Sequence, residues 1–233
     1  MRAVLIKDGK GSAENLYIGE ADKPSAGNGE VLVQVGIKAF GLNRMDISQR
    51  EGKYPPPPGA SQILGVEFSG IIVELGEGVN DWKTGDAVFG LVGGGCYAEY
   101  INVPQTHIIK KPEHLSNLIS SSVMWPPWGF IVTAFQALVL VGKMQKNDNV
   151  LVHAGASGVG VSAIQLARIY GAFNGDVVEK ITGETGQGPI RIYIHKVWHV
   201  HPLHHVYPWT QIIEAHREME DNKNSGKIVV EVD

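Results

Sequence analysis

The sequence predicts an α/β protein rich in β-structure, with a partly open β-barrel followed by a truncated nucleotide-binding unit. Two observations predict this fold class. Short runs rich in Val and Ile recur over residues 1–112 and are bounded by Gly, Pro, Asp and Asn, which is typical of a small barrel. Residues 151–172, "LVHAGASGVGVSAIQLARIYGA", have the pattern of a strand, a glycine-rich turn and a helix.

Five runs carry the strand pattern of the barrel: "AVLI", "EVLVQVGIKAF", "FSGIIVELG", "DAVFGLV" and "YAEYINV". Between them, "YPPPPGAS" is expected to be an extended surface loop, because its four prolines fix φ and provide no backbone donors. From about residue 113 the pattern becomes helical. Near the end of the chain, "TQIIEAHREMEDNK" has a partial apolar helical stripe and "KIVVEV" has the pattern of a strand. We expect both to return to the barrel.

Composition places the chain among ordinary globular proteins. Hydrophobic residues make up 43% and charged residues 19% of the 233 positions, and the formal net charge is −4. That charge gives no electrostatic reason to expect nucleic acid as a partner. The single cysteine, Cys96, excludes an internal disulfide and a multi-cysteine metal site. The N-terminus has too short an apolar run for a signal peptide, so we expect a soluble, cytoplasmic protein.

Residues 115–142 contain no charged side chain and raise the alternative of a membrane span. The most apolar part, "GFIVTAFQALVLVG", follows Pro126 and Pro127, which break a helix and leave about 14 residues. A spanning helix needs about 20. We therefore expect a buried core helix and no membrane partner.

The glycine turn can bind an anion. Gly155, Gly158 and Gly160 lie between the apolar run "NVLVHA" and the following helix. Glycines permit a tight turn and let a pyrophosphate approach the backbone N–H groups at a helix N-terminus. The spacing is G-x-x-G-x-G rather than the usual G-x-G-x-x-G. The motif alone therefore leaves two alternatives, a dinucleotide site or a strand-to-helix turn without a ligand.

Several longer stretches carry a family resemblance: "LNRMDISQREGKYPPPPGASQILGVEFSG", "WKTGDAVFGLVGGGCYAEYINVP", "TAFQALVLVG", "VLVHAGASGVGVSAIQLAR" and "EAHREMEDNKNSGKIVVEV". In this order they resemble the medium-chain dehydrogenase/reductase superfamily, in its zinc-free quinone oxidoreductase branch. The resemblance implies a GroES-like catalytic domain over residues 1–115, completed by residues 206–233. It also implies a Rossmann-like domain over residues 116–205, and hydride transfer from NADPH to a quinone or conjugated carbonyl.

The resemblance further implies roles for particular residues. Asn43, Asp46 and Tyr54 match catalytic positions of the substrate cleft, where the Tyr54 hydroxyl can orient a carbonyl. The matching cofactor-binding positions are Gly155, Ser157, Gly158, Val159, Gly160 and Thr133. Alternatives remain at each side chain. Asn43 and Asp46 also suit a turn or helix cap, and Tyr54 suits a loop anchor. Ser157 also suits a helix N-cap, and Thr133 a packed helix position.

No metal is expected at the catalytic centre. Zinc-dependent relatives have a histidine before the glutamate of a G-H-E motif, whereas "LGVEFSG" has Val66 before Glu67. A histidine cluster lies further on, and its members are His195, His199, His201, His204 and His205. Without a cysteine partner or an H-E-x-x-H motif, it suits an exposed segment at a junction, with a zinc or copper site as the alternative.

The chain departs from the family after the glycine turn. A complete doubly wound domain needs roughly 130 residues, and fewer than half that many lie between Asn147 and Leu203. The family's second strand, which holds the ribose 2′-phosphate, is missing, and "NGD" at Asp176 predicts a turn. We expect an alternatively spliced or internally deleted chain, or an incorrectly joined sequence.

Such a deletion predicts weak NADPH binding and a weakened or lost homodimer. Two functions stay open. One is an NADPH-dependent quinone reductase that acts on a small-molecule quinone. The other is a catalytically inactive isoform that acts as a binding or regulatory partner.

Overall fold

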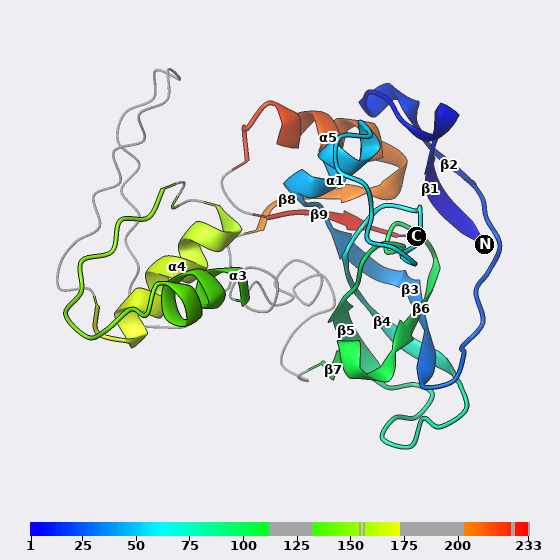
Figure 1. Ribbon diagram of the computed structural model, residues 1–233. Coiled ribbons are helices and arrows are strands. Elements are labelled where there is room, and N and C mark those ends of the chain that lie inside the picture. Colours follow the sequence, from blue (N-terminus) through cyan, green and yellow to red (C-terminus); the bar gives the residue numbers. More distant parts are fainter. Residues whose placement is uncertain (112–131, 154, 156, 173–202, 225–226, 233) are drawn as a thin grey trace. The chain divides into compact units, whose positions relative to one another are not determined.

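The computed structural model describes residues 1–111, 132–153, 155, 157–172, 203–224 and 227–232. The chain divides into two compact units, Met1–Met124 with Leu203–Asp233 and Trp125–Pro202. Strands dominate the described part of the first unit and helices that of the second (Figure 1). This confirms the predicted α/β, β-rich fold class.

The first unit is built on a seven-stranded sheet with the order β7-β5-β4-β3-β9-β8, in which β6 also pairs with β3. Its strands are β3 (Glu30–Gly41), β4 (Glu67–Leu75), β5 (Ala87–Leu91), β6 (Tyr100–Pro104), β7 (Ile108–Lys110), β8 (Leu203–Pro208) and β9 (Lys227–Glu231). Neighbours are antiparallel except β8 and β9, which are parallel. The predicted strand runs therefore all lie in strands of this unit, with "AVLI" in β1 (Arg2–Ile6), which pairs with β2 (Leu16–Glu20).

The long strand β3 joins distant parts of the chain. Its first half, Glu30–Gln34, pairs with β6, and its last residues, Ala39–Gly41, pair with β9 near the C-terminus. Its pairing with β4 shifts register between Gln34 and Ala39. The regular pairing is interrupted at this point, and β3 pairs with β6 before it and with β9 after it.

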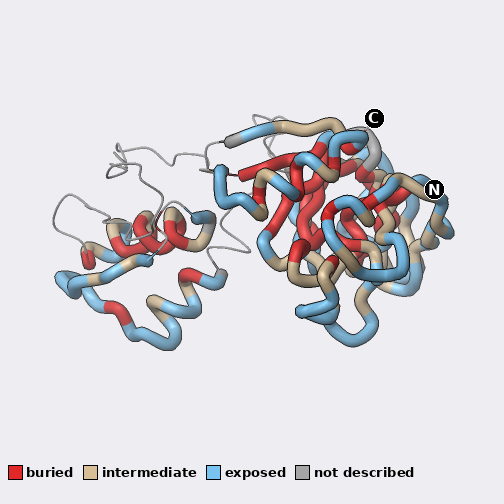
Figure 2. The backbone as a smooth tube through the Cα atoms, turned by 90° about the horizontal axis from the view of Figure 1, so that it is seen from above, coloured by how far each residue is buried: buried red, intermediate tan, exposed pale blue. Residues whose placement is uncertain are grey.

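The C-terminal segment Leu203–Asp233 belongs to the first unit. Helix α5 (Ile212–Glu220) and β9 follow β8 and the short 3-10 helix Trp209–Gln211. Trp209, Ile212, Met219 and Ile228 belong to the same buried cluster as the barrel residues. In Figure 1, α5 lies beside helix α1 (Arg44–Arg50), and the two helices are in contact. Buried residues come from both the N-terminal and the C-terminal parts of this unit. Figure 2 shows many buried stretches in it.

The described part of the second unit is a small helical assembly. Helix α3 (Val132–Phe135) continues as a π-helix (Gln136–Val141) and packs on α4 (Gly158–Ile169). The predicted helix after the glycine turn is therefore confirmed. The described part of this unit has a small core of two groups. One is Ala134, Ala163 and Leu166, and the other is Met144, Ala167 and Ala172.

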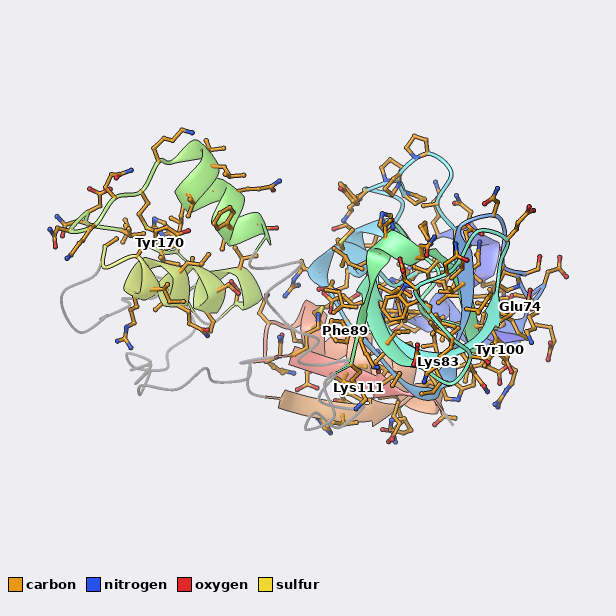
Figure 3. All side chains as sticks on the ribbon, turned by 90° about the horizontal axis from the view of Figure 1, so that it is seen from below. Glu74, Lys83, Phe89, Tyr100, Lys111 and Tyr170 are labelled. Carbon is orange, nitrogen blue, oxygen red and sulfur yellow. The ribbon has the colours of Figure 1, made fainter. Side chains whose placement is uncertain are left out.

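Two sequence predictions for this unit were wrong. The run "NVLVHA" forms no strand in the part of the chain that the structure describes, and Leu151 is 83% exposed. A strand needs a hydrogen-bonded neighbour, and none of the described residues supplies one. The helix predicted to be buried has Val141 79% exposed. Among the described residues, its packing is against α4, through Ala134, Ala163 and Leu166. Tyr170 at the end of α4 is also exposed (Figure 3).

No helix within the described ranges has both the length and the apolar character that crossing a membrane requires.

Candidate functional site

The three predicted catalytic residues lie on or just after helix α1. Asn43 is its N-cap, Asp46 lies in its first turn, and Tyr54 follows the helix end at Arg50. Asn43 and Asp46 are buried, whereas Tyr54 is 50% exposed. The structure thus separates two buried polar residues from one surface tyrosine.

Asn43 and Asp46 form a capping box at the start of α1. The Asn43 backbone N–H donates to Asp46 Oδ2 at 2.8 Å, and the Asp46 N–H donates to the Asn43 carbonyl at 3.0 Å. These bonds satisfy backbone groups that a helix end otherwise leaves without partners, and the carboxylate lies near the positive end of the helix dipole. The cap alternative is therefore what the structure shows, and contact of either side chain with a substrate stays a prediction.

Asp46 is also held by an aromatic residue that the sequence analysis did not select. The Tyr97 hydroxyl donates to Asp46 Oδ2 at 2.9 Å, while Oδ1 is buried without a hydrogen-bond partner among the described residues. Burial raises the pKa of Asp46 to about 7, against the lowering effect of the Asn43 and Tyr97 hydrogen bonds. Burial likewise raises the pKa of Tyr97 well above its ordinary value, so this hydroxyl stays protonated.

Beyond Tyr97, the polar contacts reach helix α5. Tyr97 Oη lies 3.2 Å from Nε2 of His216, and Arg50 Nη1 lies 3.1 Å from Nδ1 of the same ring. The Arg50 guanidinium also donates to the Gly11 carbonyl at 3.0 Å and pairs with Glu220. Burial, with the Arg50 charge nearby, lowers the pKa of His216 to about 3, so the ring is neutral at physiological pH.

A second buried polar contact ties β9 to the cap of α1. The Lys227 ammonium donates to Asn43 Oδ1 at 2.9 Å and forms an ion pair with Glu67 Oε2 at 2.8 Å. Lys227 and Glu67 are both buried. Glu67 stands in the "LGVEFSG" motif, so the glutamate that follows Val66 here holds a lysine from the C-terminal strand.

Tyr54 lies at the surface beside the proline loop. Its backbone N–H donates to the Ser48 carbonyl at 3.1 Å, which anchors the loop to the end of α1. The residues from Pro55 to Gly59 are exposed or half-buried, as expected for "YPPPPGAS". An accessible hydroxyl of this kind can meet a ligand, and its catalytic role stays a prediction.

The predicted cofactor residues belong to the second unit. Ser157 is the N-cap of α4, and its Oγ accepts the Gly160 N–H at 3.1 Å. Gly155 and Gly160 are buried and Val159 is half-buried, whereas Thr133 is exposed on α3. Helices α3 and α4 pack together, so the glycine turn and Thr133 share one small unit. The structure bears out Ser157 as a cap, while nucleotide binding by these residues stays a prediction.

The described part of the chain holds no group of three or more metal-ligand side chains. Cys96 is buried, and burial raises the pKa of its thiol, so it stays protonated. His205 stacks on Tyr207 with ring centroids 4.1 Å apart, and its Nδ1 lies 3.4 Å from Glu218. The side chains of the other members of the histidine cluster, and the predicted turn at Asp176, lie outside the described residues.

With this geometry in place, comparison with known proteins identifies the first unit. The sequence profile of the alcohol dehydrogenase GroES-like domain matches residues 27–113. This span is similar to an alcohol dehydrogenase GroES-like domain. In the structure this span runs from just before β3 to just after β7 and contains Asn43, Asp46 and Tyr54.

Curated relatives include synaptic vesicle membrane protein VAT-1 homologs. The Danio rerio protein is 38% identical over 146 residues, which is 63% of this chain and 29% of the relative. The Homo sapiens protein is 33% identical over 148 residues, which is 64% of this chain and 36% of the relative. The chain thus spans about a third of the length of the curated relatives it matches. The domain and these relatives support the medium-chain dehydrogenase/reductase family.

Solved structures support the same fold. A human VAT-1 homolog-like protein superposes with a TM-score of 0.79 at 20% identity, covering 100% of this chain and 98% of that one. A quinone oxidoreductase from Coxiella burnetii gives 0.77 at 24% identity, covering 100% and 99%. A mycobacterial protein complexed with NADPH gives 0.62 at 30% identity, covering 73% and 51%. These likenesses agree with a GroES-like unit combined with a Rossmann-like one.

Proposed function

We propose that this chain is a shortened form of an NADPH-dependent oxidoreductase whose complete relatives reduce quinones or similar conjugated carbonyls. One observation carries the proposal. A GroES-like domain shares the chain with a glycine turn that opens helix α4 under a serine cap. The similarity to a mycobacterial protein complexed with NADPH and to a quinone oxidoreductase supports the choice of cofactor and substrate class.

The residues present fit part of a dinucleotide. The N-terminus of α4 offers backbone N–H groups and a partial positive charge for the pyrophosphate. When bound, a reduced nicotinamide supplies hydride, and the protein aligns it with the acceptor. The exposed Tyr54 hydroxyl would donate a hydrogen bond to the acceptor carbonyl. By family resemblance, Thr133 would lie near the nicotinamide.

The fit to the rest of the cofactor is poor. By family resemblance, the adenine slot and the 2′-phosphate partners belong to a second strand that this sequence lacks. Charged hydrogen bonds of that kind contribute roughly 1.5–3 kcal/mol each. Losing two weakens binding by about 3–6 kcal/mol, or roughly two to four powers of ten. We therefore expect millimolar affinity, no preference for NADPH over NADH, and little or no quinone reduction by this chain alone.

A second candidate function is an inactive isoform that binds or regulates another protein. One observation favours it. Residues 148–153 pair with no strand in the described part of the chain, and Leu151 is exposed where the sheet of a nucleotide-binding domain would begin. In this alternative the GroES-like unit stays folded while the cofactor unit does not bind.

Titration of the purified, monodisperse chain with NADPH and with NADH by calorimetry tests the proposal. We expect equal, millimolar binding of the two nucleotides, weakened further by Ser157→Ala and unchanged by Ser25→Ala on the exposed surface of the first unit. Oxidation of NADPH with a simple ortho-quinone is measured on the same sample. No detectable binding of either nucleotide would favour the inactive isoform. Micromolar affinity with a clear NADPH preference would show that another segment replaces the lost pocket, and would refute the predicted impairment.

A further inference from the structure

A chain of four buried side chains links helix α1 to helix α5 through the segment before β6. Arg50 and Asp46 come from α1, His216 comes from α5, and Tyr97 lies between them. All four are at most 1% exposed. The contacts along the chain are 3.1 Å, 3.2 Å and 2.9 Å, in the order Arg50, His216, Tyr97, Asp46.

Chemistry fixes the direction of these hydrogen bonds. A guanidinium can only donate, so His216 Nδ1 must accept from Arg50 and carries no proton. The ring proton of neutral His216 therefore lies on Nε2 and is donated to Tyr97 Oη. The Tyr97 hydroxyl is then left to donate to Asp46 Oδ2.

These fixed donors and acceptors determine which of the four side chains can take up a further proton. His216 has no vacant position, because Nδ1 faces the Arg50 cation and Nε2 is already protonated. Asp46 has one vacant oxygen, Oδ1, which is buried without a partner among the described residues. A proton on Oδ1 removes the buried negative charge and leaves the rest of the chain unchanged. In the unfolded chain in mild acid the preference is reversed, since a solvated histidine is charged and a solvated aspartate is ionised.

We propose that folding moves one proton from His216 to Asp46, and that this exchange makes the docking of α5 insensitive to mild acid. The Nδ1–H bond of His216 breaks and an Oδ1–H bond forms on Asp46. Water carries the proton before the four side chains become buried. The pair holds one proton in either state, so solution gains or loses none.

The pKa directions agree with this exchange. Asp46 has a pKa of about 7 when folded, against an ordinary 3.8, so its contribution to stability falls as pH rises from about 4 to 7. His216 has a pKa of about 3 when folded, against an ordinary 6.5, so its contribution falls as pH drops from about 6.5 to 3. Between about pH 4 and 6.5, the two contributions to the free energy of unfolding change with pH in opposite directions and cancel.

Other charged groups face the four side chains. Lys227 and Glu67 face Asp46 as a mutual ion pair, and Glu220 and Glu51 face the Arg50 cation beside His216. The thiol of Cys96 and the hydroxyl of Tyr97 stay protonated.

The test compares the pH dependence of urea unfolding for the complete chain and for two variants. Relative to wild type, the unfolding equilibrium constant of Asp46→Asn should rise about tenfold for each pH unit lowered from 6.5 to 4.5, because only the His216 slope remains. That of His216→Gln should fall about tenfold per unit over the same range, because only the Asp46 slope remains. Exposed controls, Asp22→Asn and His107→Gln, should show neither slope. Slopes of the same sign in both variants, or none, would overturn the proposal.

Wild-type protein gives a second readout if a variant does not fold. Nitrogen NMR at pH 5 should show His216 neutral with its proton on Nε2, and carbon NMR should show the Asp46 carboxyl titrating near neutral pH. A charged His216 at pH 5, or an Asp46 carboxyl that titrates near pH 4, would refute the exchange.

Discussion

At the scale of single residues, the first unit is notable for buried charge. Lys227, Glu67 and Arg50 are all nearly inaccessible to water. Removing an ion from water is expensive, and its attraction to a partner repays the cost only with good geometry and further hydrogen bonds. Lys227 has both, since it contacts Glu67 at 2.8 Å and Asn43 at 2.9 Å.

Breaking this pair should therefore destabilise the protein strongly. Glu67→Gln leaves the Lys227 cation buried without its counter-ion, and we expect a loss of about 3–5 kcal/mol in the free energy of unfolding by urea. The double replacement Glu67→Leu with Lys227→Met removes both charges and should cost clearly less than Glu67→Gln alone. Lys223→Met, in an exposed pair with Asp221, is the control and should change little. Equal effects of Glu67→Gln and this control would contradict the argument.

Only part of this cluster could be predicted from the sequence. Asn43 and Asp46 were assigned to the substrate cleft by resemblance, with a turn or helix cap as the alternative, and the structure shows the capping box. Tyr97 and His216 gave no such signal, because their partners lie 51 and 119 residues away in the chain. A histidine in an amphipathic helix has the same local pattern whether it faces water or a buried tyrosine.

At the scale of elements, the sequence predicted helices and strands whose local residue pattern is enough to identify them. It failed for a strand that depends on a neighbouring strand to pair with. Strand β9 and helix α5 were found from their patterns and from family resemblance, and both contribute to the core. The run at 149–154 has an equally good strand pattern, yet it forms no strand in the described structure. Backbone groups need a neighbour to bond, and a pattern cannot tell whether the neighbour exists.

Removing residues 206–233 should therefore unfold or strongly destabilise the first unit. The deletion strips β9 from the edge of β3 and takes Trp209, Ile212 and Ile228 out of the core. Thermal melting and limited proteolysis of the shortened chain measure the effect. If residues 1–115 remain protease-resistant with unchanged melting, β9 and α5 are not needed for this fold.

At the scale of the whole molecule, the two units differ in how much apolar surface they cover. Among the described residues, the first unit has one large core. Those of the second unit form two small buried groups and leave Leu140, Val141, Leu151 and Ile169 more than half exposed. Apolar surface of this kind promotes association. The weakened family homodimer stays a prediction.

Charged substitutions on the second unit should consequently improve solution behaviour. Val141→Lys combined with Leu151→Lys should lower the light scattering of concentrated samples without changing the unfolding midpoint of the first unit. Leu91→Lys, on an exposed apolar residue of the first unit, serves as the control and should leave scattering unchanged. A wild-type chain that forms a clean dimer at every concentration would contradict the prediction.

The position of β9 between β3 and β8 also affects how the chain folds while it is being synthesised. On the ribosome, β3 emerges early, but its partner β9 follows roughly 190 residues later. At about 5–20 residues per second, that separation is a wait of about 10–40 s. During this time the end of β3 has an open hydrogen-bonding edge, and the barrel residues lack the C-terminal part of their core. The GroES-like unit can therefore be completed only once β9 has been made, and until then the nascent chain has an unpaired strand edge.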